Sequence, residues 1–101
     1  MSLEKPAIRI AEDEYQFSYI RAAGPGGQNV NKVATAVQLR FDVQNSPSLP
    51  EDVRLRLEHL AGKRVTAEGI LVIEARRYRT QERNRQDALD RFYRLLEKAR
   101  M

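Results

Sequence analysis

The sequence predicts a small α+β domain, in which two helices pack on one face of a mostly antiparallel sheet of three or four strands. One aromatic-rich segment, one clean apolar–polar alternation, one β-branched run and two segments with helical spacing support this class. Their order along the chain is β-β-α-β-α. Because the chain has 101 residues, we expect residues 1–101 to form a single domain.

Three segments have the composition or spacing of β-strands. Residues 15–22 are rich in β-favouring side chains, and Ile8 and Ile10 before them suggest an extended arm. Residues 37–43 alternate between apolar and polar side chains, which predicts a strand with one buried face. Residues 70–77 form the third expected strand. Three aromatic residues alternate in the first strand, and for them core packing is favoured over base stacking: Tyr15, Phe17 and Tyr19.

Two segments have the spacing of helices. Ser48-Leu49-Pro50-Glu51 has the pattern of a capping box, which places the first helix directly after Ser48. This helix ends at Gly62, and its apolar residues are Val53, Leu57, Leu60 and Ala61. A surface or packing role is favoured over catalysis for His59 on the same helix. Thr80 is expected to cap the second helix, whose apolar stripe is Ala88, Phe92, Leu95, Leu96 and Ala99.

The composition excludes several kinds of enzyme. With no cysteine and one histidine, the sequence has no disulfide, no thiol nucleophile and no Cys- or multi-His-ligated metal. We therefore expect neither a metal nor a cofactor. The longest apolar run, residues 70–73, is far shorter than a membrane span, and residues 1–6 lack the apolar core of a secretory signal. These features predict a cytoplasmic protein with no membrane partner.

The whole excess of positive charge lies in the second half of the chain. Residues 51–101 carry thirteen basic and nine acidic side chains, whereas residues 1–50 carry five of each. Five arginines fall within ten residues: Arg76, Arg77, Arg79, Arg83 and Arg85. Arginine suits phosphate binding and base stacking, so the cluster indicates sequence-independent contact with RNA. A solvated start to the last helix is the alternative interpretation.

The connection between the first two strands is long and rich in glycine. Residues 23–32 hold three of the five glycines within four positions, whereas a simple hairpin needs two to five connecting residues. Ordering glycine costs backbone entropy, so we expect a mobile loop. The spacing fits neither a Walker loop, because Asn31 precedes Lys32, nor a dinucleotide fingerprint, which needs glycine in place of Asn29. A plain mobile connector is the alternative to a functional loop.

Gly26-Gly27-Gln28, within the longer run from Gly24 to Lys32, resembles the catalytic loop of peptide-chain release factors. The resemblance continues over nearly the whole chain, through Arg21, Thr35, Ala36, Phe41, Ser48 to Pro50, Tyr78 to Gln81, Asn84 and Arg85. In length the chain is similar to the short, codon-independent YaeJ/ArfB-type peptidyl-tRNA hydrolases that rescue stalled ribosomes. That group usually continues into a Lys/Arg-rich tail, which is absent from this chain; either the chain is truncated at Met101 or the protein lacks the tail. A related pattern often has histidine where this chain has Asn29.

The resemblance implies ribosome-dependent hydrolysis of the ester that joins the nascent peptide to transfer RNA. Its implied partners are the peptidyl-transferase centre of the large subunit, ribosomal RNA and peptidyl-tRNA. Gln28 does not titrate, so it would act by donating its backbone N–H to developing negative charge and by orienting water. Gly26 and Gly27 would let the backbone approach RNA closely. The resemblance also makes Gln28 a candidate for N-methylation, and Arg21 and Lys32, beside the loop, are expected to contact ribosomal phosphates in preference to plain solvation.

Two other classes of function stay open at this point. A non-catalytic ribosome- or RNA-binding module would keep the same fold. A free-standing esterase is disfavoured, because one histidine and no cysteine leave little material for a Ser-His-Asp arrangement or a thiol nucleophile. We expect the domain to be a monomer when it is not on the ribosome.

Overall fold

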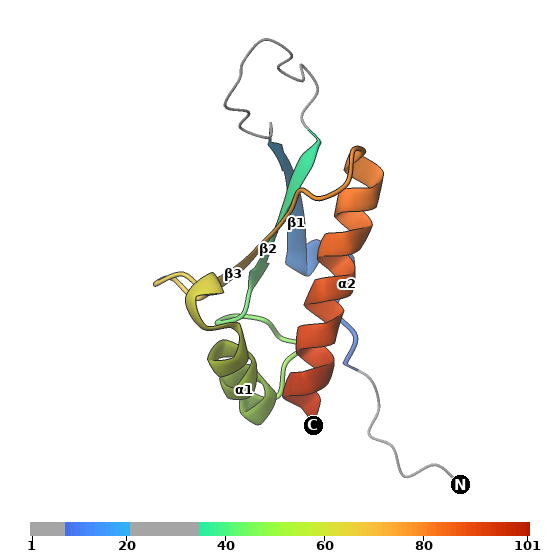
Figure 1. Cartoon of the computed structure of the whole chain (residues 1–101). Helices are drawn as coiled ribbons and strands as arrows, with labels where there is room; N and C mark the ends of the chain where they lie inside the picture. Colours follow the sequence, from blue (N-terminus) through green and yellow to red (C-terminus); the bar gives the residue numbers. More distant parts are fainter. Residues whose placement is uncertain (1–7, 21–34) are drawn as a thin grey trace, which may run out of the picture.

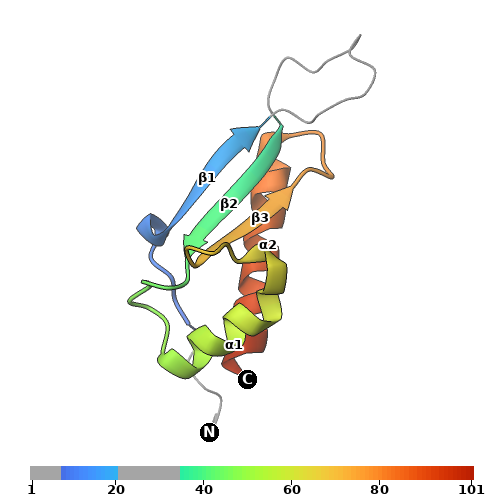
Figure 2. The ribbon, with the colours of Figure 1, turned by 90° about the vertical axis from the view of Figure 1, so that its left-hand side faces the viewer.

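The computed structural model describes residues 8–20 and 35–101. The elements in chain order are β1 (Tyr15–Ile20), β2 (Ala36–Asp42), α1 (Glu51–Ala61), β3 (Ile70–Ala75) and α2 (Gln81–Arg100), with short 3-10 turns at Glu12–Glu14 and Gly62–Arg64. The three strands lie side by side with α2 behind them (Figure 2). The expected α+β class and the order β-β-α-β-α are confirmed, with three strands in the sheet.

β2 is the central strand and pairs antiparallel with both neighbours. Ile20, the last residue of β1, lies opposite Ala36, the first residue of β2. Ala75, the last residue of β3, lies opposite Val37. One end of the sheet therefore holds the exit from β1, the entry to β2 and the exit from β3.

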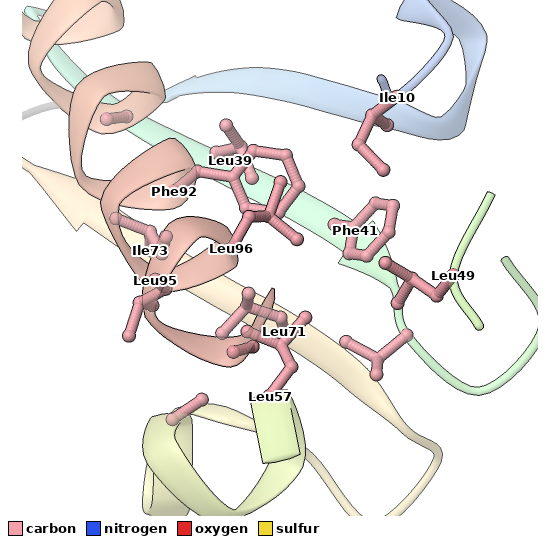
Figure 3. Close-up of a cluster of buried hydrophobic side chains, with 14 of the residues drawn as sticks. Ile10, Leu39, Phe41, Leu49, Leu57, Leu71, Ile73, Phe92, Leu95 and Leu96 are labelled. Carbon is pink, nitrogen blue, oxygen red and sulfur yellow. The ribbon is translucent and has the colours of Figure 1, made fainter. Parts of the chain in front are cut away.

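The core lies between the sheet and the two helices. The alternating residues predicted for the second strand are almost completely buried, and so is the stripe of α2 that packs on them. Figure 3 shows the side chains meeting from both sides, and the Phe92 ring lies 4.8 Å from the Phe41 ring. α1 adds Val53, Leu57 and Ala61 to the same core. These spacings confirm the predicted strand and both helices.

Some predicted burial is wrong at the margins of the core. Leu60 is 40% exposed, because α1 buries a narrow stripe in which each residue is four after the last. Tyr15 and Phe17 pack against the core as predicted, but Tyr19, near the end of the edge strand β1, is 42% exposed. Ile10 is buried without forming a strand.

The predicted capping box at Ser48 is wrong. α1 begins at Glu51 after Pro50, and no side chain caps it. The Ser48 hydroxyl instead donates to the Glu14 carboxylate at 2.5 Å, and the Ser46 hydroxyl donates to the other carboxylate oxygen at 2.5 Å. Pro50, not Ser48, is the N-cap residue of α1, so Ser48 stands two residues before the cap and its hydroxyl donates to the charged Glu14 acceptor.

The other predicted helix ends are confirmed. Gly62 follows α1 with a φ of 57°, a conformation that favours glycine. The Thr80 hydroxyl accepts a hydrogen bond from the backbone N–H of Arg83 at 3.2 Å, which caps α2. The third strand ends at Ala75, two residues before the predicted boundary at Arg77.

The described residues hold neither a candidate membrane span nor a candidate metal site. Within 8–20 and 35–101, no helix combines the length and apolar character needed to cross a bilayer. The same residues contain no group of three or more acidic, His or Cys side chains arranged to hold a metal ion.

The bonds from Ser46 and Ser48 predict acid-sensitive stability. Burial raises the pKa of Glu14, but hydrogen bonds from Ser46, Ser48 and the Ala11 N–H lower it more, so the pKa lies below its ordinary value. A depressed carboxyl pKa stabilises the fold at neutral pH, and this contribution is lost as the pH falls through the folded-state value. Glu14→Gln should lower the free energy of unfolding by about 1 kcal/mol at pH 7, and its difference from wild type should shrink as the pH falls through the folded-state pKa of Glu14.

Urea denaturation across pH measures this difference. Glu12→Gln is the matched control, because Glu12 is an exposed acid on the same short turn. Equal losses for the two variants, or a constant deficit for Glu14→Gln at every pH, would contradict the role of Glu14.

Candidate nucleic-acid interface

The predicted site residues fall into two groups. Five lie outside the described residues: Arg21, Gly26, Gly27, Gln28 and Lys32. The predicted mobile loop, residues 23–32, also lies outside them. The five predicted RNA-binding arginines are described, and all five are exposed: Arg76, Arg77, Arg79, Arg83 and Arg85.

The arginines gather at the end of the sheet where β1 ends and β2 begins. β3 also ends at this end of the sheet, so the connection 76–80 and the first turn of α2 begin there (Figure 1). The backbone leaves β1 at Ile20 and re-enters the described structure at Thr35 on the same edge. The antiparallel register thus brings the arginine-rich segment next to both attachment points of segment 21–34.

Asn84, on the first turn of α2, is the fully buried polar residue at this edge. Its Oδ1 accepts a hydrogen bond from the Tyr78 N–H at 2.9 Å. Its Nδ2 donates to the Thr35 carbonyl at 2.7 Å and to the Tyr78 carbonyl at 3.0 Å. One side chain therefore joins three parts of the chain: the start of β2, the arginine-rich connection and α2.

Two of the five arginines are paired with acidic residues of the domain. Arg76 forms an ion pair with Glu74 at 2.5 Å. Arg77 forms one at 2.8 Å with Asp87, whose side chain is only 4% exposed. The hydrogen bond to Asp87 raises the pKa of the Arg77 guanidinium above its ordinary value. These internal partners offset the positive charge that Arg76 and Arg77 would present to a ligand.

Asp87 is held from two sides. Besides Arg77, it pairs with Arg91 on the next turn of α2 at 3.3 Å, and Arg91 also donates to the Glu74 carbonyl at 2.6 Å. The Asp87 carboxylate therefore connects α2 to the end of β3. Because a buried carboxylate needs compensating charge, these ion pairs have a structural role in the fold besides their place on the surface.

The other three arginines present unneutralised charge. Arg79, Arg83 and Arg85 form no ion pair with residues 8–20 or 35–101. The Arg83 guanidinium lies 4.3 Å from the centre of the Tyr78 ring, and that of Arg85 lies 6.0 Å from the centre of the Phe17 ring. Cation–π contact holds a guanidinium in place and leaves its N–H donors free for phosphate.

An open pocket of about 390 Å³ lies beside Tyr78. Three guanidinium groups, two carboxylates, an amide and the tyrosine ring line it: Arg77, Arg83, Arg94, Asp87, Asp90, Gln86 and Tyr78. Guanidinium groups bind phosphate, while carboxylate and amide groups can bond to the polar edge of a base. This lining suits an unpaired nucleotide better than an apolar ligand.

The sequence prediction omitted Asn84 and Asp87 from the site. A signal for Asn84 was present, because it stands four residues before Ala88, in line with the apolar stripe of α2. A polar residue in an apolar stripe is buried with partners, or it lies at a site. The partners themselves come from other segments, so the sequence alone does not identify them.

The comparisons with known proteins agree with this architecture. The model of the RF-1 domain family matches residues 3–101. The chain belongs to the RF-1 domain family. This RF-1 domain is 51% identical over 89 residues to the protein named Peptidyl-tRNA hydrolase ArfB from Pseudomonas putida, a match that covers 88% of this chain and 64% of that protein.

Two further relatives are more distant or match a shorter region. The domain is 34% identical over 82 residues to Large ribosomal subunit protein mL62 from Mus musculus, covering 81% of this chain and 40% of that protein. It is 53% identical over 36 residues to Peptide chain release factor PrfB1, chloroplastic, from Arabidopsis thaliana, covering 36% of this chain and 8% of that protein. This RF-1 domain therefore spans less than two thirds of the length of the curated relatives described here.

The pairing of Asp87 predicts a clear difference between two carboxylates on α2. Asp87→Ala should destabilise the RF-1 domain by about 3 kcal/mol, because it leaves the Arg91 guanidinium without its buried partner. Asp90→Ala, at an exposed position whose carboxylate accepts a hydrogen bond from Gln86, should cost about 0.5 kcal/mol or less. Urea denaturation measures both, and equal costs would contradict the structural role of Asp87.

Proposed function

We propose that this RF-1 domain hydrolyses the ester of peptidyl-tRNA on stalled ribosomes, without reading a codon. The observation that carries the proposal is Gly26-Gly27-Gln28 in a chain that is 51% identical to a protein named as a peptidyl-tRNA hydrolase. The proposed partners are the large ribosomal subunit, ribosomal RNA and peptidyl-tRNA. The domain acts in the cytoplasm and is a monomer when it is not on the ribosome.

The proposed chemistry needs no acid, base or nucleophile from the protein. Water attacks the ester carbonyl, the bond to the ribose 3′ oxygen breaks, and that oxygen takes a proton to leave as a hydroxyl. The Gln28 backbone N–H stabilises the developing oxyanion, and its side-chain amide orients the water. The terminal 2′-hydroxyl of the transfer RNA and ribosomal RNA supply the proton transfers, in keeping with a chain that has one histidine and no cysteine.

The described arginines divide into two classes in this proposal. Arg79, Arg83 and Arg85 bind RNA phosphates, because they are exposed and have no acidic partner within 8–20 or 35–101. Arg76 and Arg77 contribute less, since Glu74 and Asp87 already neutralise them. The pocket beside Tyr78 offers an unpaired nucleotide a place next to these phosphate contacts. Arg21 and Lys32 add two more basic side chains from segment 21–34.

Loop substitutions test the catalytic proposal. Gly27→Ala should slow release of labelled peptide from stalled ribosomes on the order of 100-fold, because the added Cβ displaces the reacting groups. Gln28→Ala should slow it about 10-fold or more, because the amide that orients water is lost. Affinity for the ribosome, measured separately, should change little in either variant.

Three outcomes would select another function. Wild-type rates in both variants, with binding intact, would indicate the non-catalytic ribosome- or RNA-binding module. No release by the wild-type domain would reject the proposed hydrolase. Release from free peptidyl-tRNA without ribosomes would indicate the free-standing esterase.

Salt dependence tests the division among the arginines. The triple variant Arg79→Ala, Arg83→Ala, Arg85→Ala should bind ribosomes more weakly. The slope of the logarithm of its binding constant against the logarithm of the salt concentration should decrease in magnitude by about 2 to 3. Arg76→Ala is the matched control, because Arg76 is exposed in the same segment but paired with Glu74. Its slope should fall by well under 1. A similar decrease for Arg76→Ala and for each single variant would contradict the division.

A further inference from the structure

The pairing of β2 with β3 stops before the chain reaches the interface. The last register pair is Val37 with Ala75. Thr35 lies two residues before Val37, and Tyr78 lies three residues after Ala75, so both stand beyond the strand ladder. At this point the Asn84 carboxamide joins them, through the Thr35 carbonyl on one side and the Tyr78 N–H and carbonyl on the other.

The carboxamide is fully used in this bridge. Its oxygen accepts one hydrogen bond, each of its two N–H groups donates one, and the side chain has no exposed surface. Asn84 is itself fixed, because its backbone N–H donates to the Thr80 carbonyl in the first turn of α2, at 3.1 Å. The helix that packs on the core thus determines where Thr35 lies.

We propose that Asn84 is a positioning residue for peptide release. It fixes Thr35, the residue directly after segment 21–34, relative to the segment that carries Tyr78 and Arg79. Thr35, where the described chain resumes, and the arginine-rich connection therefore share one hydrogen-bonded support. This role depends on the proposed function, in which the arginines hold RNA while the loop acts on the ester.

The chemistry of the bridge requires an amide at this position. Asn84→Asp keeps the shape but replaces two donors by a carboxylate oxygen that faces the Thr35 and Tyr78 carbonyls. Among residues 8–20 and 35–101, the donor to this carboxamide is the Tyr78 N–H, and Asp87, one turn later, is already paired with Arg77 and Arg91. Burial and the two carbonyls favour the protonated carboxyl, which regains one donor. Asn84→Ser carries no charge and loses most of the bridge at every pH.

The experiment measures kcat and KM for peptide release from stalled ribosomes between pH 6 and pH 8. We expect Asn84→Asp to lower kcat about 10-fold at pH 8 with KM within about 2-fold of wild type, because the arginines still bind. Relative to wild type, its kcat should recover as the pH falls. Asn84→Ser should show a similar loss of kcat that does not change with pH. This variant tests the inference if Asn84→Asp fails to fold.

The control is Leu57→Val, which weakens the core from α1, at the other end of the domain (Figure 1). It should match the loss of thermal stability of the Asn84 variants while kcat stays at the wild-type value. Amide NMR spectra give a readout without ribosomes: Asn84→Asp should shift Thr35, Ala36 and Tyr78 signals selectively.

The outcomes separate this inference from the function on which it depends. If the Asn84 variants keep wild-type kcat, or lose it together with Leu57→Val and without pH recovery, Asn84 has a purely structural role and the inference fails alone. If KM rises while kcat stays constant, Asn84 supports binding and the inference also fails. If the wild-type domain releases no peptide, the proposed function fails first and the positioning role fails with it.

Discussion

Phe92 of α2 packs against Phe41 of the central strand, and this contact fixes α2 along the sheet. A helix of twenty residues is about 30 Å long, so α2 runs from one end of the domain to the other. At its first turn it holds Asn84 and the exposed arginines beside the entry to β2. In its last turn the Ala99 carbonyl accepts a hydrogen bond from Arg56 of α1 at 2.5 Å. One packed helix therefore links the core of the domain to the proposed interface.

This arrangement divides the proposed work between protein and RNA. The folded part of the domain positions groups. A buried amide fixes one end of the sheet, and some of the nearby arginines are paired with acidic residues while others are available to bind RNA. Such groups bind and orient, but none of them transfers protons readily at neutral pH. The reaction then relies on groups that the ribosome and the substrate carry. A chain with one histidine and no cysteine suits that division.

The parts of the fold that the sequence predicted are those with a strong local period. The alternation from Val37 to Val43 and the stripe from Ala88 to Ala99 both give their burial directly, because each follows the geometry of one element. The error at Ser48 arose because a distant partner binds its side chain. Ser48 has the local pattern of a cap, but the Glu14 carboxylate binds its hydroxyl from 34 residues away.

At the interface, too, the sequence predicted the local feature but not the contacts between distant residues. The sequence predicted a basic cluster from Arg76 to Arg85 but treated its members alike. Only the fold pairs Arg77 with Asp87 and leaves Arg83 against the Tyr78 ring. The Gly26-Gly27-Gln28 motif, in contrast, indicates its chemistry through the resemblance alone, since these residues lie outside the described part of the chain.

In the proposed function, this domain directs water onto the ester of ribosome-bound peptidyl-tRNA. Release of a defined peptide from stalled ribosomes in ¹⁸O-labelled water, followed by mass spectrometry, tests it most directly. We expect release that depends on the domain, with one ¹⁸O atom in the terminal carboxylate of the peptide. No release above that of ribosomes alone, or released peptide without the label, would contradict it.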